Sequence, residues 1–514
     1  MAQRKVYIDL TSFYSTDFLS GIQRVVREVV TRLLKMSELE LVLFVWKSEE
    51  KKLSVLSNND FLKCYDEEAI KKSEIRTVKK IGIDDLESGS VLFDIDSTWD
   101  GRCHNRYEVV PYLSTRGVLI TPYIYDVLPI TNPEFWPWPI PLFYGYIASN
   151  LRYADCLITS VNETVRKLGV IAKRSNALLP HCAVSWLGSD FKADKIFGDV
   201  SEKAKVAVSK GKFILCVGTL EPRKNHKVVL DAYDKKLASL GINLIFAGRR
   251  GWSVDELLTR IDSHPRKNNG FYFLEGENDA TINYLYQNAW AVVFPTFDEG
   301  FGLPLVEALL HGSVSVASDI PVMHEVGGVY CDYFDSNNCD TLIKIIEGYL
   351  ERPAVYDACK KRASEYRPVL WDEVALRIKD TLVNLRKDEE REKKMKDINV
   401  EQIMQEIRAD IAKKGYKMSD LEFEEIKKPD ALSRILSDLS KNWRVDLYPP
   451  VSGNKIKRLI KKIIRKIVRP SFMGTMKTQE TFNSYIVQSF NQMEKYIREL
   501  EVRIMELESK TEEM

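Results

Sequence analysis

The sequence predicts an α/β protein in which two doubly wound parallel sheets face a cleft and a helical tail follows. Short β-branched runs alternate with helical patterns up to about residue 195, and the same alternation restarts at residue 212. The length of 514 residues agrees, because single cores rarely grow beyond about 250–300 residues. We therefore expect one domain over residues 1–195 and a second over residues 196–385.

The composition is that of a globular chain, with 45% hydrophobic and 29% charged residues. This balance excludes a collagen-like or largely disordered protein. Eight cysteines without a CxxC pair predict reduced thiols rather than disulfides or zinc ligands. A strand-like run begins at Val6, which leaves no room for a signal peptide. The sequence contains no run of about 18 apolar residues, the length that is needed to cross a bilayer. We therefore expect a cytoplasmic protein.

In the first domain, short apolar runs without alternation indicate strands that are buried on both faces. Helical patterns at residues 24–34 and 164–168 are expected to cover the sheet. The expected strands are residues 6–10, 41–46, 91–93, 118–125 and 156–159.

The second domain repeats this alternation, and a different composition follows it. Eleven of the twelve residues at 386–397 are charged, which indicates a solvated linker. This linker and further helical segments extend to residue 453, and nothing beyond residue 400 has the strand content of another enzymatic core. The expected strands of the second domain are residues 213–217, 242–247, 271–274, 291–294 and 314–317.

The most informative motif follows the strand expected at residues 291–294. The run Glu299–Gly302 leads into a helix that begins at Leu303 with proline in its first turn, a favoured place for proline. A helix N-terminus reached through glycines presents N–H groups that suit a diphosphate. Glu299 and Glu307 can then contact different parts of a ligand, such as sugar and ribose hydroxyls. Taken alone, the pair also fits two surface glutamates beside a tight turn.

Basic residues follow two other strands of the second domain. Arg223 and Lys224 stand in a short turn before a helix, at the sheet edge where α/β proteins bind ligands. Arg249 and Arg250 follow the next strand. These cations are candidates to hold phosphate oxygens, and solvated turns are the alternative. No His or Asp cluster has metal-ligand spacing, so we predict no metal site.

Together, E-G-F-G-L-P-L-V-E and the earlier V-G-T-L-E-P-R-K-N resemble the donor domain of the retaining glycosyltransferases of family 4, which have the GT-B fold. The likeness extends to W-D-E-V at residues 371–374, which resembles the family's closing helix that crosses back to the first domain. It implies that Glu299 is catalytic and contacts the donor sugar, and that Glu307 binds the ribose. Thr219 stands where many members have an arginine on the diphosphate. Arg223, Arg249 or Arg250 would substitute, and weaker binding of the diphosphate is the alternative. The implied diphosphate contacts are Lys224, Arg223, Arg249, Gly300, Phe301, Gly302 and Leu303.

The N-terminal half is similar, more weakly, to the acceptor domain of the polysaccharide-building, O-antigen mannosyltransferase-like branch of that family. The run G-I-Q-R-V resembles the start of its first helix, which makes Gly21 and Arg24 acceptor-side candidates. Tyr125 and Asp126 lie where many relatives have His-Asp. We assign the catalytic polar role there to Asp126, with Tyr125 beside it on the acceptor side, and a structural role at a strand end is the alternative.

An aromatic and proline-rich stretch runs from Pro129 to Tyr146. Its five prolines exclude one regular helix across the whole stretch. An aromatic loop at an acceptor cleft would stack on sugar rings or touch a membrane interface. A buried loop packed on the first sheet is the alternative.

The pattern of residues 454–470 predicts a helix that lies on a membrane surface. Eight Lys or Arg and no acidic residue lie between Lys455 and Arg469, opposite an aliphatic stripe with helical spacing. This arrangement favours an anionic membrane over nucleic acid. The rest of the chain has 67 basic and 74 acidic side chains, so we expect no nucleic-acid binding there.

Residues 471–514 show heptad spacing, which predicts a coiled coil that joins two copies or recruits an assembly partner. A single helix packed on the body is the alternative.

These patterns and the resemblance predict an enzyme at the inner face of the cell membrane. It would transfer a hexose from a GDP- or UDP-linked sugar, with retention, onto a lipid-linked or growing surface polysaccharide. Mannose is the sugar that the family favours, and we expect no cofactor besides this donor. The alternatives are a catalytically decayed membrane scaffold of a polysaccharide assembly complex and a nucleotide-sugar epimerase of the same fold.

Overall fold

A computed structural model describes residues 3–16, 21–99, 101–136, 141–175, 177–189 and 198–388. These residues belong to one compact unit, which ends at Asp397. The predicted membrane helix at 454–470 and the predicted coiled coil at 471–514 lie outside the described residues.

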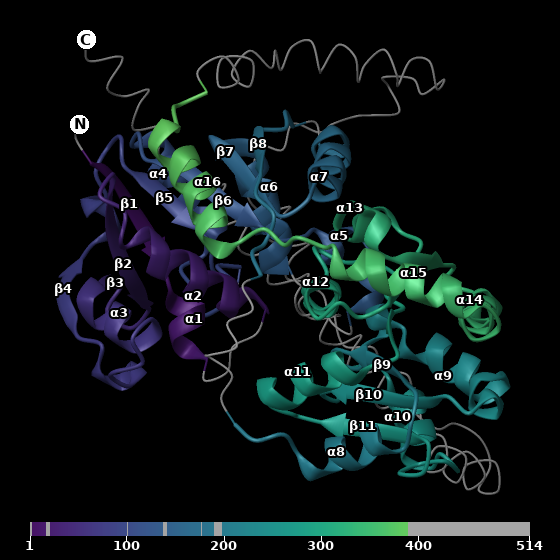
Figure 1. The fold of residues 1–514 in the computed structure, drawn as a ribbon. Helices are drawn as coiled ribbons and strands as arrows, with labels where there is room; N and C mark the ends of the chain where they lie inside the picture. Colours follow the sequence, from purple (N-terminus) through teal and green to yellow (C-terminus); the bar gives the residue numbers. More distant parts are fainter. Residues whose placement is uncertain are drawn as a thin grey trace, which may run out of the picture. The chain divides into compact units, whose positions relative to one another are not determined.

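The first sheet has the strand order β4-β3-β2-β1-β5-β6-β7-β8 among the described residues (Figure 1). Pairing is parallel from β2 to β8, and β3 and β4 extend the edge in antiparallel fashion. All five predicted strands are present. The strands are β1 (Arg4–Asp9), β2 (Leu39–Lys47), β3 (Lys52–Leu56), β4 (Thr77–Ile81), β5 (Val91–Asp94), β6 (Leu119–Ile124), β7 (Cys156–Thr159) and β8 (His181–Val184).

The second sheet is parallel throughout its described strands, in the order β11-β10-β9-β12-β13-β14. It contains the five predicted strands and adds β14 at the edge. The prediction of two doubly wound sheets is therefore confirmed. The strands are β9 (Phe213–Val217), β10 (Asn243–Gly248), β11 (Phe271–Glu275), β12 (Ala291–Phe294), β13 (Ser315–Ser318) and β14 (Asp332–Phe334).

Helices follow most of these strands and bury them. Every residue of β5, β7, β12 and β13 is buried, as in parallel sheets with both faces covered. The helices of the first domain are α1 (Thr11–Ser15), α2 (Gly21–Leu33), α3 (Asn58–Tyr65), α4 (Arg106–Thr115), α5 (Leu128–Thr131), α6 (Pro141–Tyr153) and α7 (Asn162–Arg174). Those that follow are α8 (Glu202–Ser209), α9 (His226–Lys235), α10 (Asp255–Asp262), α11 (Asp279–Asn288), α12 (Leu303–Leu310), α13 (Pro321–Gly327), α14 (Cys339–Glu351), α15 (Pro353–Ser364) and α16 (Trp371–Asn384).

Helix α16 returns from the second domain to the first, where it packs against α2 (Figure 1). Trp371 at its start is buried, and a Cβ on Gly188 would lie 2.5 Å from the Trp371 ring. Glycine is required there because the backbone approaches the ring so closely. Arg32 Nε also donates to Asp372 Oδ1 at 2.5 Å.

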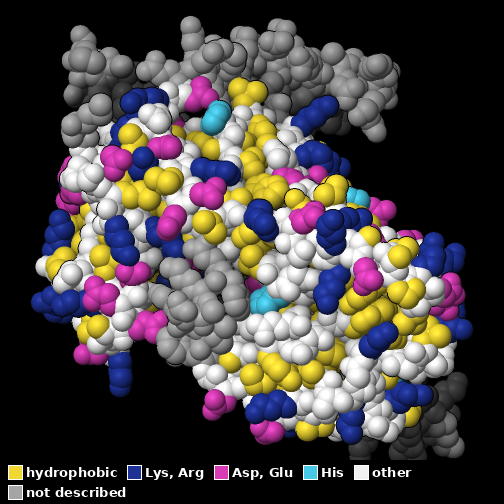
Figure 2. All heavy atoms as spheres, viewed as in Figure 1, with side chains coloured by type: hydrophobic (Ala, Val, Ile, Leu, Met, Phe, Trp, Pro, Cys, Tyr) yellow, Lys and Arg dark blue, Asp and Glu magenta, His cyan; other side chains and the backbone are white. Residues whose placement is uncertain are grey.

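The described surface carries charges of both signs. Figure 2 shows Lys and Arg side chains interspersed with Asp and Glu over the visible face. Within the described residues, no helix combines the length and apolar character needed to cross a membrane.

Candidate active site

A cleft of about 670 Å³ is lined by both domains. The first domain contributes one face of α2 along most of its length, the end of α3 with the residues after it, and residues that follow β6, β7 and β8. The second contributes the loop after β9, part of α11 and the loop that leads into α12. Strand ends of both parallel sheets therefore meet one cleft, which is where doubly wound proteins bind ligands.

Glu299 lies in this cleft between two cations. Its Oε2 lies 2.6 Å from Arg223 Nη1, and its Oε1 pairs with Lys224 Nζ. Its side chain is only 10% exposed. Burial opposes ionisation, but Arg223 and Lys224 outweigh it and lower the pKa of Glu299 to about 2. The carboxylate is therefore charged at neutral pH.

Arg223 and Lys224 lie in the 3₁₀ turn η5 (Pro222–Lys224), within the loop between β9 and α9. Arg223 also donates from Nη2 to Glu221 Oε1 at 2.6 Å and from Nη1 to the Asp298 carbonyl at 2.8 Å. Both line the cleft, as a diphosphate site requires, and both are paired with Glu299 in this structure.

Two glycines shape the loop that leads into α12, for different reasons. A Cβ on Gly300 would lie 2.9 Å from the Tyr125 carbonyl oxygen and 3.0 Å from Asp126 Oδ2, so the loop touches the first domain directly. Gly302 has a φ of +95°, a left-handed conformation that favours glycine. Helix α12 then begins at Leu303 with proline in its first turn, as predicted. Phe301 is buried and lines the cleft with Leu303.

Tyr125 and Asp126 follow β6 and point in different directions. The Tyr125 side chain is buried, and its hydroxyl donates to the Ile95 carbonyl at 2.6 Å. Asp126 Oδ1 accepts from Leu128 N at 3.0 Å. Burial raises the pKa of Asp126, although the Leu128 N–H and the Arg223 cation oppose the rise. Asp126 is therefore the side chain of this pair that offers a polar group to the cleft.

Arg24 and Glu307 form an ion pair across the cleft. Arg24 Nη1 on α2 lies 2.7 Å from Glu307 Oε1 on α12, and the Tyr286 hydroxyl lies 3.3 Å from Glu307 Oε2. A Cβ on Gly21 would lie 3.8 Å from Leu303 Cδ1, so the starts of α2 and α12 face each other. The structure thus brings together an acceptor-side candidate and the predicted ribose contact.

Arg249 and the described residues of the aromatic stretch before residue 137 lie outside the lining of the cleft. Arg249 is exposed and is absent from the described lining of the cleft. The Phe135 ring stacks on Phe297 at 5.7 Å between centroids, and its carbonyl accepts from Trp252 Nε1 at 2.9 Å. This part of the stretch therefore packs on the second domain. Trp138 lies outside the described residues.

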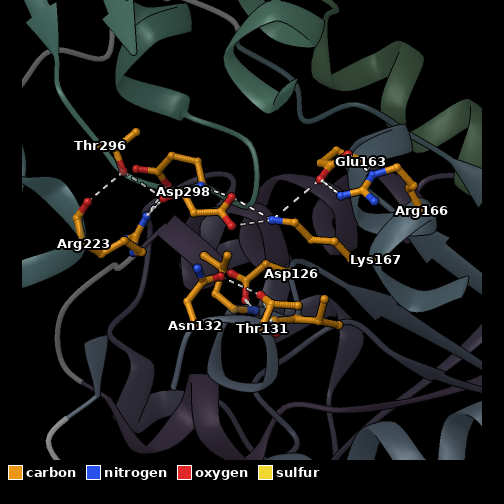
Figure 3. A network of polar contacts seen from close by, with 12 residues as sticks. Asp126, Thr131, Asn132, Glu163, Arg166, Lys167, Arg223, Thr296 and Asp298 are labelled. Carbon is orange, nitrogen blue, oxygen red and sulfur yellow. Dashed lines mark hydrogen bonds and ion pairs between the residues drawn. The ribbon is translucent and has the colours of Figure 1, made fainter. Parts of the chain in front are cut away.

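No sequence pattern assigned a role to three polar residues near Glu299: Ser160, which lines the cleft, and the pair Lys167 and Asp298, which lies beside the donor loop. Lys167 Nζ on α7 lies 2.6 Å from Oδ2 of Asp298 (Figure 3). Asp298 is the residue that precedes Glu299 in the sequence. A lysine in an amphipathic helix carries no sequence signal for such a contact. Within the described part of the chain, no group of three or more His, Cys, Asp or Glu side chains is placed to hold a metal ion.

Residues 199–366 match the family model described as glycosyl transferases group 1. This range covers the second sheet and includes Glu299, Arg223, Lys224 and Glu307. The chain therefore carries a glycosyl transferases group 1 domain, and the resemblance read from the motifs is confirmed at this level.

Curated relatives match parts of the chain as well. Serotype-specific mannosyltransferase WbdA from Escherichia coli is 27% identical over 372 residues, which are 68% of this chain and 43% of the relative. O-antigen chain mannosyltransferase RfbU from Salmonella typhimurium is 34% identical over 143 residues, or 27% of this chain and 39% of the relative. The chain thus spans less than half the length of these relatives.

Solved structures share the fold over both domains. The structure "Trehalose-6-phosphate from E. coli bound with UDP-2-fluoro glucose" has a TM-score of 0.51 at 12% identity, covering 74% of this chain and 99% of that one. The Candida albicans trehalose-6-phosphate phosphatase N-terminal domain also gives a TM-score of 0.51 at 12% identity, covering 74% and 97%. The likeness is one of fold alone, and the predicted GT-B architecture is confirmed.

Proposed function

We propose that this chain is a glycosyltransferase that moves a hexose from a nucleoside-diphosphate sugar onto a growing surface polysaccharide. The group 1 domain and the mannosyltransferase names of the relatives support this proposal. Mannose from a GDP- or UDP-linked donor is the sugar that we expect. UDP-2-fluoro glucose in a neighbour of the same fold is consistent with a nucleotide-linked donor.

The observation that carries the proposal is the ionised Glu299 beside the N-terminus of α12, inside a cleft lined by both domains. A carboxylate there can accept hydrogen bonds from hydroxyls of a donor sugar. The N–H groups at the start of α12 favour the negative charge of a diphosphate. Donor sugar and leaving group would thus be held on adjacent residues of one loop.

We further propose that transfer proceeds with retention of configuration, as the family resemblance implies. Preorganised donors around the diphosphate would stabilise the charge that develops as it leaves. Asp126, across the loop from Gly300, would hold a hydroxyl of one of the sugars. Glu307 would exchange its pairing with Arg24 for the ribose hydroxyls.

Our proposals for the acceptor and for the location of the protein are based on sequence patterns. We propose a lipid-linked glycan as the acceptor. The basic segment at 454–470 would hold the enzyme at an anionic membrane, and the heptads at 471–514 would join it to a second copy or an assembly partner.

The test is nucleotide release from a panel of GDP- and UDP-linked sugars. Wild-type protein should release nucleotide from one of them, and Glu299→Gln should reduce turnover by about 100-fold or more. Glu351→Gln, on the exposed end of α14, is the matched control and should leave turnover unchanged. A wild type that is inactive on the whole panel would contradict the proposal, as would a fully active Glu299→Gln.

A further inference from the structure

Lys167 reaches from α7 of the first domain to the loop that carries Glu299. Its Nζ lies 2.7 Å from Oδ1 and 2.6 Å from Oδ2 of Asp298, so it contacts both carboxylate oxygens (Figure 3). The two side chains are 12% and 16% exposed. Water therefore screens this pair less than a surface ion pair, and loss of one partner would leave the other charge uncompensated.

Asp298 transmits this contact to Glu299. The same Oδ1 that accepts from Lys167 also accepts from Glu299 N at 2.8 Å. The Asp298 carbonyl accepts from Arg223 Nη1 and Thr296 Oγ1, both at 2.8 Å. Arg223 in turn pairs with the Glu299 carboxylate. The backbone of Glu299 is thus fixed through Asp298, and its side chain through the adjacent cations.

The connection between β7 and α7 contacts the second domain at two further points. Ser160 Oγ donates to the Gly300 carbonyl at 3.0 Å. Glu325 on α13 accepts from Asn162 N at 2.7 Å and from Glu163 N at 3.1 Å, which caps the start of α7. Helix α7 is therefore anchored to the second domain just before Lys167.

We propose that Lys167 is a positioning residue, which holds Asp298 and thereby sets Glu299 in its working orientation. The inference rests on the proposed function and goes beyond it, because it makes the geometry of the donor loop depend on a side chain of the other domain. The loop is then ordered for reaction only while α7 lies against it.

The charges around Asp126 provide a second, electrostatic readout of the Lys167 side chain beside the split between kcat and KM. Asp126 accepts from Leu128 N at the start of α5. The charges of Arg223 and Glu299 on the second domain and of Lys167 on α7 act on it. Lys167 and Arg223 lower the pKa of Asp126, whereas Glu299 raises it. Removing Lys167 should therefore raise the pKa of Asp126 and move the acidic limb of the pH–rate profile to higher pH.

The experiment compares Lys167→Met, Lys167→Arg and Arg166→Met in the full chain, with GDP-mannose or the most active sugar nucleotide of the panel. Lys167→Met should lower kcat by about tenfold or more while donor KM changes by less than about threefold. Lys167→Arg should restore most of the kcat. Arg166→Met is the control for loss of a neighbouring cation, because Arg166 is exposed and its ion pair, with Glu163, lies within α7. Lys167 Nζ, by contrast, is 4.0 Å from that carboxylate and contacts Asp298 directly. Arg166→Met should behave as wild type.

Asp298→Asn tests the same contact from the other side. It should lower kcat like Lys167→Met, and adding Lys167→Met to it should reduce kcat by less than about twofold more. If Lys167→Met fails to fold, Asp298→Asn alone tests whether the contact between Lys167 and Asp298 is needed for turnover. An active wild type with unchanged kcat and pH profile in both variants would overturn this inference alone. A wild type inactive on every donor would overturn the proposed function as well.

Discussion

Gly300 is a residue at which the backbone of the donor loop touches the first domain, and this contact leaves no space for a side chain. Glu299 before it and Gly302 after it have separate requirements, one for charge and one for a left-handed backbone. The four residues of E-G-F-G thus meet three separate requirements: a charge at Glu299, no side chain at Gly300 and a left-handed backbone at Gly302. This explains why the motif was the most informative part of the sequence.

Gly300→Ala should impair catalysis without unfolding either domain. The new Cβ would lie within 3.0 Å of the Tyr125 carbonyl and of Asp126, so the loop or the facing domain must shift. A misplacement of about 1 Å near the reacting groups costs on the order of 100-fold in rate. We expect a loss of kcat/KM approaching that size, measured by nucleotide release.

Gly82→Ala is the control for Gly300→Ala, because the nearest atom to its new Cβ would lie 3.5 Å away, in ordinary contact. It should keep wild-type kcat/KM. If Gly300→Ala also kept it, the close approach of the two domains would not matter for catalysis.

The residues found from the sequence are those whose type and spacing form a motif. Glu299, Arg223 and Lys224 were all predicted near one ligand, and they form one charge cluster in the structure. Lys167 and Asp298 were missed because their partners lie 131 positions apart, and no local pattern marks such a pair. Arg24 and Glu307 were predicted singly, but their pairing depends on how the two domains meet.

At the level of elements, the strands that the sequence reveals are those of the parallel core, β1, β2, β5, β6 and β7 in the first sheet and β9 to β13 in the second. Strand β3 was missed although four of its five residues are buried, because it is short and its apolar run is interrupted by Ser54. Strand β4 is exposed along most of its length and carries two lysines, so it has no apolar signal. Strands β8 and β14 lie at sheet edges and are only partly buried. Such strands are defined by hydrogen bonds to a neighbour, which a sequence pattern does not show.

Helix α7 depends on the other domain for its cap. The residue before it, Val161, has no side chain that could accept from the first N–H groups, and Glu325 of α13 supplies the acceptor. Glu325→Ala should therefore lower the free energy of unfolding by about 0.5–2 kcal/mol, the usual cost of a lost N-cap. Denaturant unfolding measures this change.

Glu351→Ala serves as the control for Glu325→Ala, because Glu351 lies exposed at the end of α14. Its effect should stay within about 0.5 kcal/mol. Equal effects of the two substitutions would mean that the contact does not stabilise α7.

In the described unit, the two domains are joined by polar contacts that surround the cleft. Arg24 with Glu307 spans it between α2 and α12, Lys167 with Asp298 lies beside the donor loop, and Arg32 with Asp372 ties α16 to α2. A ligand that binds Glu307 must compete with Arg24. Binding of the donor is therefore linked to the contact between the two domains, because both involve the Glu307 carboxylate.

The tail should act independently of this machinery, because every donor-site residue identified in the described part of the chain lies before residue 385. At roughly 1 kcal/mol for each basic residue near an anionic surface, the segment at 454–470 should be sufficient for reversible membrane binding. Reversing Lys461, Lys462, Arg465 and Lys466 to glutamate should abolish flotation with anionic liposomes. It should leave self-association through residues 471–514 and nucleotide release unchanged, as measured by light scattering and turnover.

The control for this charge reversal changes the net charge equally at exposed positions of the body, Lys203, Lys210, Lys344 and Lys360. If the bound element is the basic segment, the control protein still floats, because the control leaves the charges of that segment unchanged and the surface potential of a membrane acts only within about 10 Å of the surface. Loss of flotation in both proteins would indicate attraction by net charge alone. Undiminished flotation of the tail variant would assign membrane binding to another surface, with the aromatic stretch around Trp136 as the next to test.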